Sequence, residues 1–225
     1  MRHNTTDWGN RSLNFLDGLN RLFCVSYHRL RYDTLPLPET GSAIVASNHV
    51  SGLDPLLLIA ASPRPLRFLI AREQYERYGL QWLFRAVKCI PVDREQRPGR
   101  AMREALRALV NGDVIALFPH GGIHLDTDPA RKLKAGVVRL ALKSHSTIYP
   151  ARLTGVAGQG HVIAALLQRG HARIENFPPL HAHSHGPDHT QQTLEHLAAS
   201  IEGRNTAQCN LNPADVDKNS LNKAS

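Results

Sequence analysis

A histidine and an aspartate with the spacing His49-x4-Asp54 follow an apolar segment early in the chain. A carboxylate one short turn from an imidazole can fix which ring nitrogen carries the proton, and it can support the charge of the protonated ring. Residues 43–47 form an apolar run that predicts a strand before His49, and residues 55–61 predict a helix after it. The pattern therefore predicts a general base at the end of a strand.

The same spacing occurs twice more, in different surroundings. His28 and Asp33 lie in an arginine-rich stretch, whereas His183 and Asp188 lie in a polar segment rich in His, Gly and Pro. Neither pair follows an apolar run that would form a buried strand. A single His-x4-Asp pair is thus weak evidence, and the surroundings of His49 are what give it weight.

Three further blocks follow in order, each closing an apolar segment. They are Cys89-Ile90-Pro91-Val92-Asp93-Arg94, the run from Val114 that ends in Phe118-Pro119-His120-Gly121-Gly122, and Thr147-Ile148-Tyr149-Pro150-Ala151. With the His49 block, they resemble the glycerolipid acyltransferase family over roughly residues 35–179. Four blocks in this order are a far more specific sign of the resemblance than any one block alone.

The resemblance implies an activity: transfer of a fatty acyl group from acyl-CoA or acyl-carrier protein to the free hydroxyl of a lysophospholipid. The simplest acceptor is 1-acyl-sn-glycerol-3-phosphate, which gives phosphatidate. In this interpretation His49 is the general base, Asp54 orients it, and the acceptor supplies the nucleophile. The implied substrate-binding residues are Arg94 for the acceptor phosphate, Phe118, Pro119, His120, Gly121 and Gly122 of the third block, and Pro150 for the donor. No cofactor beyond the donor and no metal is expected.

Two positions depart from the family pattern. The third block usually carries glutamate where this chain has His120, and the second usually carries glycine where it has Lys88. His120 can donate, accept or titrate, so it keeps two alternatives open. One is an acyltransferase for another lyso-lipid, such as lyso-ornithine lipid. The other is a catalytically degenerate lipid-binding scaffold, against which His49 and Asp54 are both intact.

Composition narrows the class of partner. The 27 Lys and Arg exceed the 19 Asp and Glu and give a net charge of +8, which suits an anionic partner such as a phosphorylated substrate or an acidic membrane surface. No nucleic-acid recognition motif is present, so nucleic acid is not expected.

From the residues alone, Arg94 could equally pair with its neighbours Asp93 or Glu95. The three cysteines lack metal-ligand spacing and indicate a reducing compartment.

The N-terminal region alternates large apolar residues with arginines. This spacing predicts an amphipathic helix over residues 12–30 with Ser12 as its N-cap. Its apolar face could pack on the domain or dock on anionic lipid, and the resembled family uses N-terminal helices for membrane association. No apolar stretch approaches the roughly 20 residues that span a bilayer, and no signal peptide is recognised. We expect a cytoplasmic protein that associates peripherally with the cytoplasmic face of the membrane.

Strand and helix patterns alternate along the chain and predict an α/β fold: one domain with a central mixed β-sheet flanked by helices. We expect an N-terminal helical segment (1–34), an acyltransferase domain (35–204) and a disordered tail (205–225). The predicted strands are 43–47, 66–71, 87–92, 114–118, 147–151, 161–166 and 172–177. The predicted helices after residue 54 are 55–61, 73–85, 99–110, 132–143 and 190–202.

Two histidine clusters could suggest metal binding. The first combines His120, His124 and Asp126, whose side chains suit zinc, but the intervening glycines disfavour a helix that would align them. The second contains His181, His183, His185 and His189 in a polar segment, which is more typical of a solvated loop. We therefore predict no metal site.

Overall fold

The computed structural model describes residues 6–76, 81–93, 98–129, 131–160, 164–182 and 187–203. Seven strands of this part form one sheet in the order β1-β7-β6-β2-β5-β3-β4. Their bounds are β1 (Arg31–Tyr32), β2 (Ala43–Ser47), β3 (Leu66–Ala71), β4 (Ile90–Val92), β5 (Val114–Leu117), β6 (Thr147–Thr154) and β7 (Arg173–Asn176). All neighbours pair in parallel except β6 and β7, which pair antiparallel. The predicted mixed sheet is confirmed.

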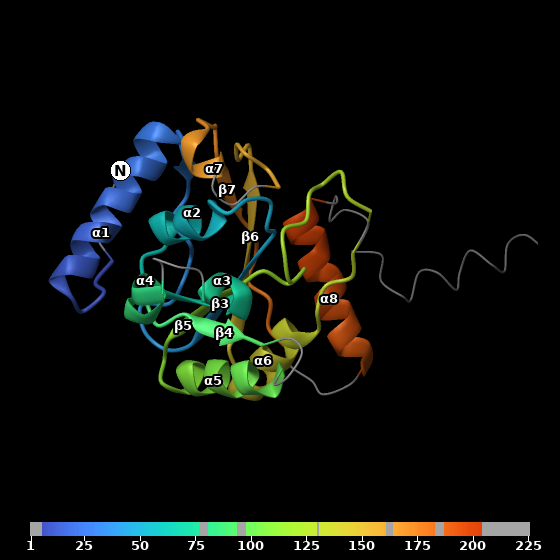
Figure 1. Ribbon diagram of the computed structural model, residues 1–225. Coiled ribbons are helices and arrows are strands. Elements are labelled where there is room, and N and C mark those ends of the chain that lie inside the picture. The colour runs from blue at the N-terminus through green and yellow to red at the C-terminus, as the bar shows by residue number, and fades with distance from the viewer. Residues whose placement is uncertain are drawn as a thin grey trace, which may run out of the picture.

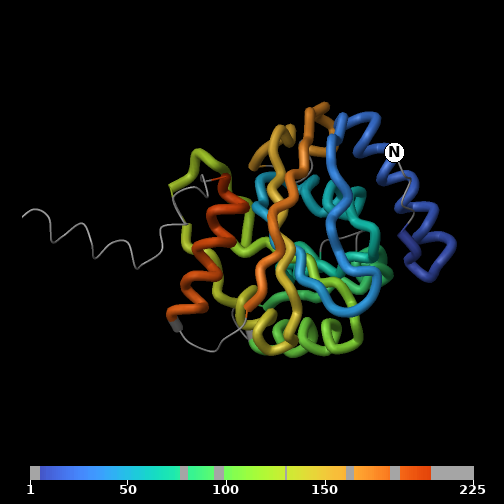
Figure 2. The backbone as a smooth tube through the Cα atoms, turned by 180° about the vertical axis from the view of Figure 1, so that it is seen from behind, coloured from blue at the N-terminus to red at the C-terminus, as the bar shows by residue number. Residues whose placement is uncertain are grey.

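Helices cover both faces of this sheet (Figures 1 and 2). They are α1 (Arg11–Leu22), the π-helical turn η1 (Phe23–Tyr27), α2 (Asp54–Ala61), α3 (Arg72–Tyr75), α4 (Gln81–Ala86), α5 (Pro98–Val110), α6 (Gly136–Ser144), α7 (Ala164–Leu167) and α8 (Pro187–Glu202). Helix α1 lies on one side of the molecule and α8 on the other (Figure 1). The sheet is therefore the middle layer of a three-layer α/β domain.

The two faces of the sheet carry separate hydrophobic clusters. In β2, Ala43 and Val45 join the cluster that includes residues of α2, while Ile44 and Ala46 join the cluster that includes α5, α6 and α8. Every residue of β2 and β5 is buried. These continuous apolar runs are what parallel strands covered on both faces require, because neither face meets water.

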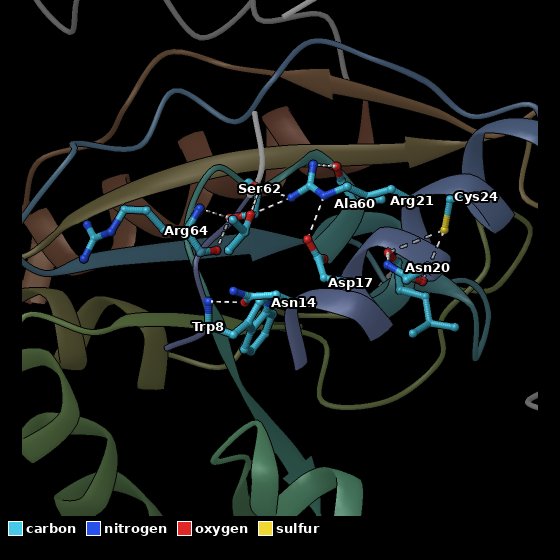
Figure 3. Close-up of polar contacts among 11 residues, drawn as sticks. Trp8, Asn14, Asp17, Asn20, Arg21, Cys24, Ala60, Ser62 and Arg64 are labelled. Atoms are coloured by element: carbon cyan, nitrogen blue, oxygen red, sulfur yellow. Dashed lines mark hydrogen bonds and ion pairs between the residues drawn. The ribbon is translucent and has the colours of Figure 1, made fainter. Parts of the chain in front are cut away.

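Helix α1 docks on the domain through polar groups (Figure 3). Asp17 is its buried residue, and the Arg21 guanidinium donates to Asp17 Oδ2 at 2.8 Å and to the carbonyls of Ala60 and Ser62, both at 2.7 Å. The large apolar residues lie on the outer side, with Phe15 66% and Leu22 63% exposed. The predicted helix therefore exists, with its apolar face directed away from the domain.

Several predicted boundaries were wrong. Asn10 caps α1 in place of Ser12, because its side-chain oxygen accepts from the backbone N–H groups of Ser12 and Leu13. The α-helix ends at Leu22, and the next turn is π-helical. The predicted helix 73–85 contains two short helices, α3 and α4.

Two strand predictions also need correction. Residues 164–166 of the predicted strand 161–166 belong to the helix α7, and residues 161–163 lie outside the described part. The short strand β1 was missed, because two residues of an arginine-rich stretch carry no periodic signal. The predicted tail at 205–225 lies outside the described residues. No helix of the described part is long and apolar enough to cross a bilayer.

Candidate active site

His49 and Asp54 meet in the turn that joins β2 to α2. His49 Nδ1 lies 2.8 Å from Asp54 Oδ2, and Asp54 is the first residue of α2. Because a carboxylate accepts hydrogen bonds, this contact places the proton of a neutral imidazole on Nδ1 and leaves the lone pair on Nε2. The side chain of His49 is 18% exposed, whereas that of Asp54 is fully buried. The imidazole is therefore open to a molecule from outside, while the carboxylate is not.

The backbone of the turn holds the carboxylate in place. Asp54 Oδ2 also accepts hydrogen bonds from the N–H groups of Val50 at 2.7 Å and Ser51 at 2.9 Å. Hydrogen bonds to an ionised carboxylate are among the strong ones, so one oxygen fixes the turn and the imidazole together. The five-residue spacing matters because it lets the helix begin at the residue that faces back toward His49.

Asn48 is a residue that sequence analysis missed. Its amide nitrogen donates to the carbonyl of Leu153 at 2.9 Å, and its amide oxygen accepts from the N–H of Leu153 at 2.7 Å. Asn48 is buried, so these bonds tie the residue before His49 to β6. A buried amide directly after an apolar strand is the signal that could have revealed it.

The loop after β5 contacts His49 at two points. The ring of Phe118 stacks on the imidazole with centroids 4.1 Å apart and planes inclined by 12°. The N–H of His124 donates to the carbonyl of His49 at 2.7 Å. The structure thus brings the first and third sequence blocks together.

His120 is buried and its imidazole lies against α8. Its Nε2 is 3.1 Å from Glu202 Oε1, and its ring lies 4.6 Å from that of His124. Burial lowers the pKa of His120, although the hydrogen bond to Glu202 works in the opposite direction. At neutral pH the ring is therefore uncharged.

Two residues of the first histidine cluster have other partners. Asp126 pairs with Arg152 at 3.1 Å, and His124 Nδ1 lies 3.5 Å from Asp128 Oδ2. Within the described ranges, no group of three His, Cys, Asp or Glu side chains could hold a metal ion. In the second cluster, His181 contacts Thr147 at 3.1 Å, while His183 and His185 lie outside the described residues.

The glycine pair forms a turn. Gly121 has a φ of +76°, a conformation that favours glycine, whereas the nearest atom to a Cβ there is Lys134 Nζ, the end of a flexible side chain that can move aside. Its N–H donates to the carbonyl of Phe118 at 2.9 Å, so this amide serves the turn, contrary to the free N–H expected at an anion site. A Cβ on Gly122 would meet nothing within 4 Å.

Pro119, Pro150 and Lys88 lie in different surroundings. Pro119 is buried and its carbonyl accepts from the N–H of Lys134 at 3.0 Å. Pro150 is buried on β6 in register with Ala46 of β2. Lys88 has a φ of +54°, which explains why a glycine suits this position: the left-handed conformation costs other residues energy.

A cavity of about 630 Å³ opens at the carboxyl ends of β3 and β4. Three arginines and two carboxylates are among its lining residues: Arg72, Arg85, Arg100, Glu76 and Asp93. Arg72 bridges the two acids, at 2.7 Å from Glu76 and 3.0 Å from Asp93. Arg94, the residue after Asp93, lies outside the described part. Because the neighbouring strands are parallel, the cavity lies at the same sheet edge as His49.

Known proteins match this chain over most of its length. It is 23% identical to the 1-acyl-sn-glycerol-3-phosphate acyltransferase of Bacillus subtilis over 77% of this chain and 83% of the relative. It is 28% identical to a probable enzyme of the same name from Mycoplasma genitalium, over 60% of this chain and 52% of the relative.

A solved structure shares the fold. The crystal structure of the 1-acyl-sn-glycerophosphate acyltransferase from Thermotoga maritima superimposes with a TM-score of 0.66 at 17% identity, covering 89% of this chain and 80% of that one. The sequence model of the family described as Acyltransferase matches residues 29–154, which include the His49 block and the loop after β5. More than half of the sequence follows that pattern, and the chain therefore belongs to the Acyltransferase family.

Proposed function

We propose that this chain transfers a fatty acyl group from acyl-CoA or acyl-carrier protein to 1-acyl-sn-glycerol-3-phosphate, with phosphatidate as the product. The observation that carries the proposal is the 2.8 Å contact between His49 Nδ1 and the buried Asp54, with the imidazole still accessible. Relatives from Bacillus subtilis and Mycoplasma genitalium bear the name of this activity. The intact pair argues against a degenerate scaffold.

In the proposed mechanism His49 acts as a general base. Its Nε2 removes the proton of the acceptor hydroxyl while the hydroxyl oxygen attacks the thioester carbonyl carbon. The tetrahedral intermediate collapses, the carbon–sulfur bond breaks, and the imidazolium returns the proton to the leaving thiolate. Asp54 keeps the proton of the neutral ring on Nδ1 and stabilises the imidazolium that forms. The products are one ester and one free thiol, and no cofactor besides the donor takes part.

The arginine-lined cavity supports a phosphorylated acceptor. Its three arginines outnumber its two carboxylates, and guanidinium groups bind phosphate through parallel hydrogen bonds. We assign Arg94, which follows the cavity residue Asp93, to the acceptor phosphate. Arg94→Ala should then raise KM for the acceptor about tenfold while changing KM for the donor little. Arg139→Ala, at an exposed residue of α6, is the matched control, and equal losses for both substrates would contradict this role.

The proposed activity is tested by thiol release from palmitoyl-CoA and from palmitoyl-acyl-carrier protein. 1-Acyl-sn-glycerol-3-phosphate and lyso-ornithine lipid are offered separately to wild type and to His49→Ala. We expect release with the phosphate acceptor, lost in the variant. Release with lyso-ornithine lipid alone would transfer the proposal to that acceptor. Release with neither acceptor, from either donor, would contradict the proposed activity.

We further propose that α1 docks the protein on the cytoplasmic face of an anionic membrane. Its exposed apolar residues Phe15, Leu19 and Leu22 recur at helical spacing, so they share one face. The polar side of α1 is occupied by contacts with the domain, which leaves this face available. An apolar helix face buried at the lipid interface would bring a lipid acceptor and the enzyme together.

The free cysteines Cys24 and Cys89 suit the reducing cytoplasm.

Flotation with vesicles tests the membrane proposal. With vesicles containing phosphatidylglycerol, the double variant Phe15→Ser/Leu22→Ser should lose most of the bound fraction. Val110→Ser is the matched control, because Val110, at the end of α5, is an apolar residue even more exposed than Phe15 and Leu22. Unchanged flotation of the double variant would contradict docking through α1.

A further inference from the structure

The loop after β5 touches His49 from outside the turn that carries His49. Phe118 stacks on the imidazole, and the His124 N–H bonds the His49 carbonyl. Both contacts depend on where residues 118–124 lie. A shift of this loop by a fraction of an ångström would therefore move the ring that is expected to take the proton.

The loop is tied in turn to the last residue of α8. His120 Nε2 lies 3.1 Å from Glu202 Oε1, and the two side chains are 1% and 17% exposed. The other ring nitrogen of His120, Nδ1, is buried without a hydrogen-bond partner in the part of the chain described. A neutral ring with its proton on Nε2 that donates to Glu202 satisfies this arrangement. The end of α8 and the loop lie side by side in Figure 1.

We propose that Glu202 is a positioning residue for acyl transfer, which acts on His49 through His120 and the loop of residues 118–124. This inference rests on the proposed function. His120 lies in the loop, and the carboxylate that it contacts comes from the C-terminal helix α8. Glu202 is thus the partner that makes histidine tolerable at a buried site, because a buried polar ring without any partner is costly.

Three variants test the inference by steady-state kinetics. Glu202→Ala removes the acceptor of the His120 hydrogen bond and should lower kcat about tenfold, with a smaller change in KM, because the loop contacts on His49 are disturbed while the arginine-lined cavity is left intact. Glu202→Gln keeps an oxygen acceptor and should restore kcat to within about twofold of wild type. Glu195→Ala is the matched control, because exposed Glu195 lies on the same helix and contacts Gln191 of that helix.

A second readout does not depend on turnover. The imidazole 1H–15N signals of His49, assigned by their loss in His49→Ala, should shift in Glu202→Ala and return toward wild-type positions in Glu202→Gln. If Glu202→Ala does not fold, Glu202→Asp takes its place, because the shorter side chain withdraws the acceptor. Unmoved His49 signals with unchanged kcat would overturn the inference even if the melting temperature falls. If wild type releases no thiol, the proposed function fails and the His49 signals alone decide this inference.

Discussion

The segments His28–Asp33 and His49–Asp54 have the same spacing and opposite outcomes. His49 bonds Asp54 at 2.8 Å and remains 18% exposed. His28 is fully buried, and neither of its ring nitrogens has a hydrogen-bond partner within the described residues. Its ring packs edge-on against Phe23 and Tyr27. One histidine is thus placed to exchange a proton, and the other is packed as an apolar group.

The backbone between the two residues makes the difference. The residues after His28 run into β1, an extended strand that pairs with β7, so Asp33 is carried away to an exposed position. The residues after His49 turn directly into α2, which returns Asp54 to the imidazole. Between these two segments, the His-x4-Asp spacing gives a hydrogen-bonded pair where the chain turns and starts a helix at the aspartate.

The largest expected contrast is between the two histidines themselves. His49→Ala should lower kcat roughly 10²- to 10⁴-fold, the usual contribution of a general base. His28→Ala should leave kcat within about twofold of wild type when it is assayed well below its melting temperature. Thiol release under saturating donor and acceptor measures both. A comparable loss of kcat in folded His28→Ala would contradict the contrast.

The two aspartates, Asp54 and Asp33, give a second test of the contrast between the two histidines. Asp54→Asn keeps the shape of the side chain and should lower kcat about 10²-fold or more, because an amide neither fixes the Nδ1 proton nor supports the imidazolium as a carboxylate does. Asp33→Asn, at an exposed site, should have no measurable effect. Pre-steady-state thiol release separates the chemical step from product release. An active Asp54→Asn enzyme would remove Asp54 from the mechanism.

The aromatic neighbours give a smaller effect. Phe118→Leu keeps an apolar contact with His49 but loses the flat stacking surface, so kcat should fall about fivefold, since a loosely held base spends less time in the productive geometry. Phe23→Leu, next to His28, should change kcat by less than about twofold. Equal effects of the two substitutions on kcat would show that the stacking has no special role.

The smallest expected effect concerns His28 and the free energy of unfolding alone. Burial lowers the pKa of His28 in the folded state, so the unfolded chain takes up a proton first as the pH falls. The free energy of unfolding should therefore decline as the pH drops below 6.5, the ordinary value for histidine. His28→Leu should flatten this decline between pH 7 and pH 5, measured by urea denaturation. Part of the decline should remain, because the pKa of His120 is lowered in the same direction.

Most strands and most helices could be predicted from sequence because their signal is local. Ala43–Ser47 and Val114–Leu117 are uninterrupted apolar runs, and α5 buries Ala101, Ala105 and Ala108 at helical spacing. The His49 and Asp54 pair was predictable for the same reason, since both residues lie within one turn. The cap of α1 was missed because Asn10 and Ser12 are both good capping residues, and only the backbone distinguishes them.

The rest of the site depends on contacts between distant residues. His120 is paired with Glu202, and Asn48 is paired with the backbone of Leu153. Neither contact has a spacing that one sequence could reveal. The orientation of α1 was equally hidden, because periodicity shows that a helix has two faces without showing which one the domain takes.

The Arg21 guanidinium has a consequence for Asp54 at the far end of α2. Ala60 is near the end of α2 and Ser62 is its C-cap, so Arg21 caps the last carbonyls of that helix with a positive charge, where the helix dipole is negative. Asp54 places a negative charge at the opposite, positive end. Helix α2 thus has a complementary charge at each end, and the positive one is supplied by Arg21 of α1. Trimming the N-terminal region would uncap α2 and weaken the support of Asp54, the first residue of that helix.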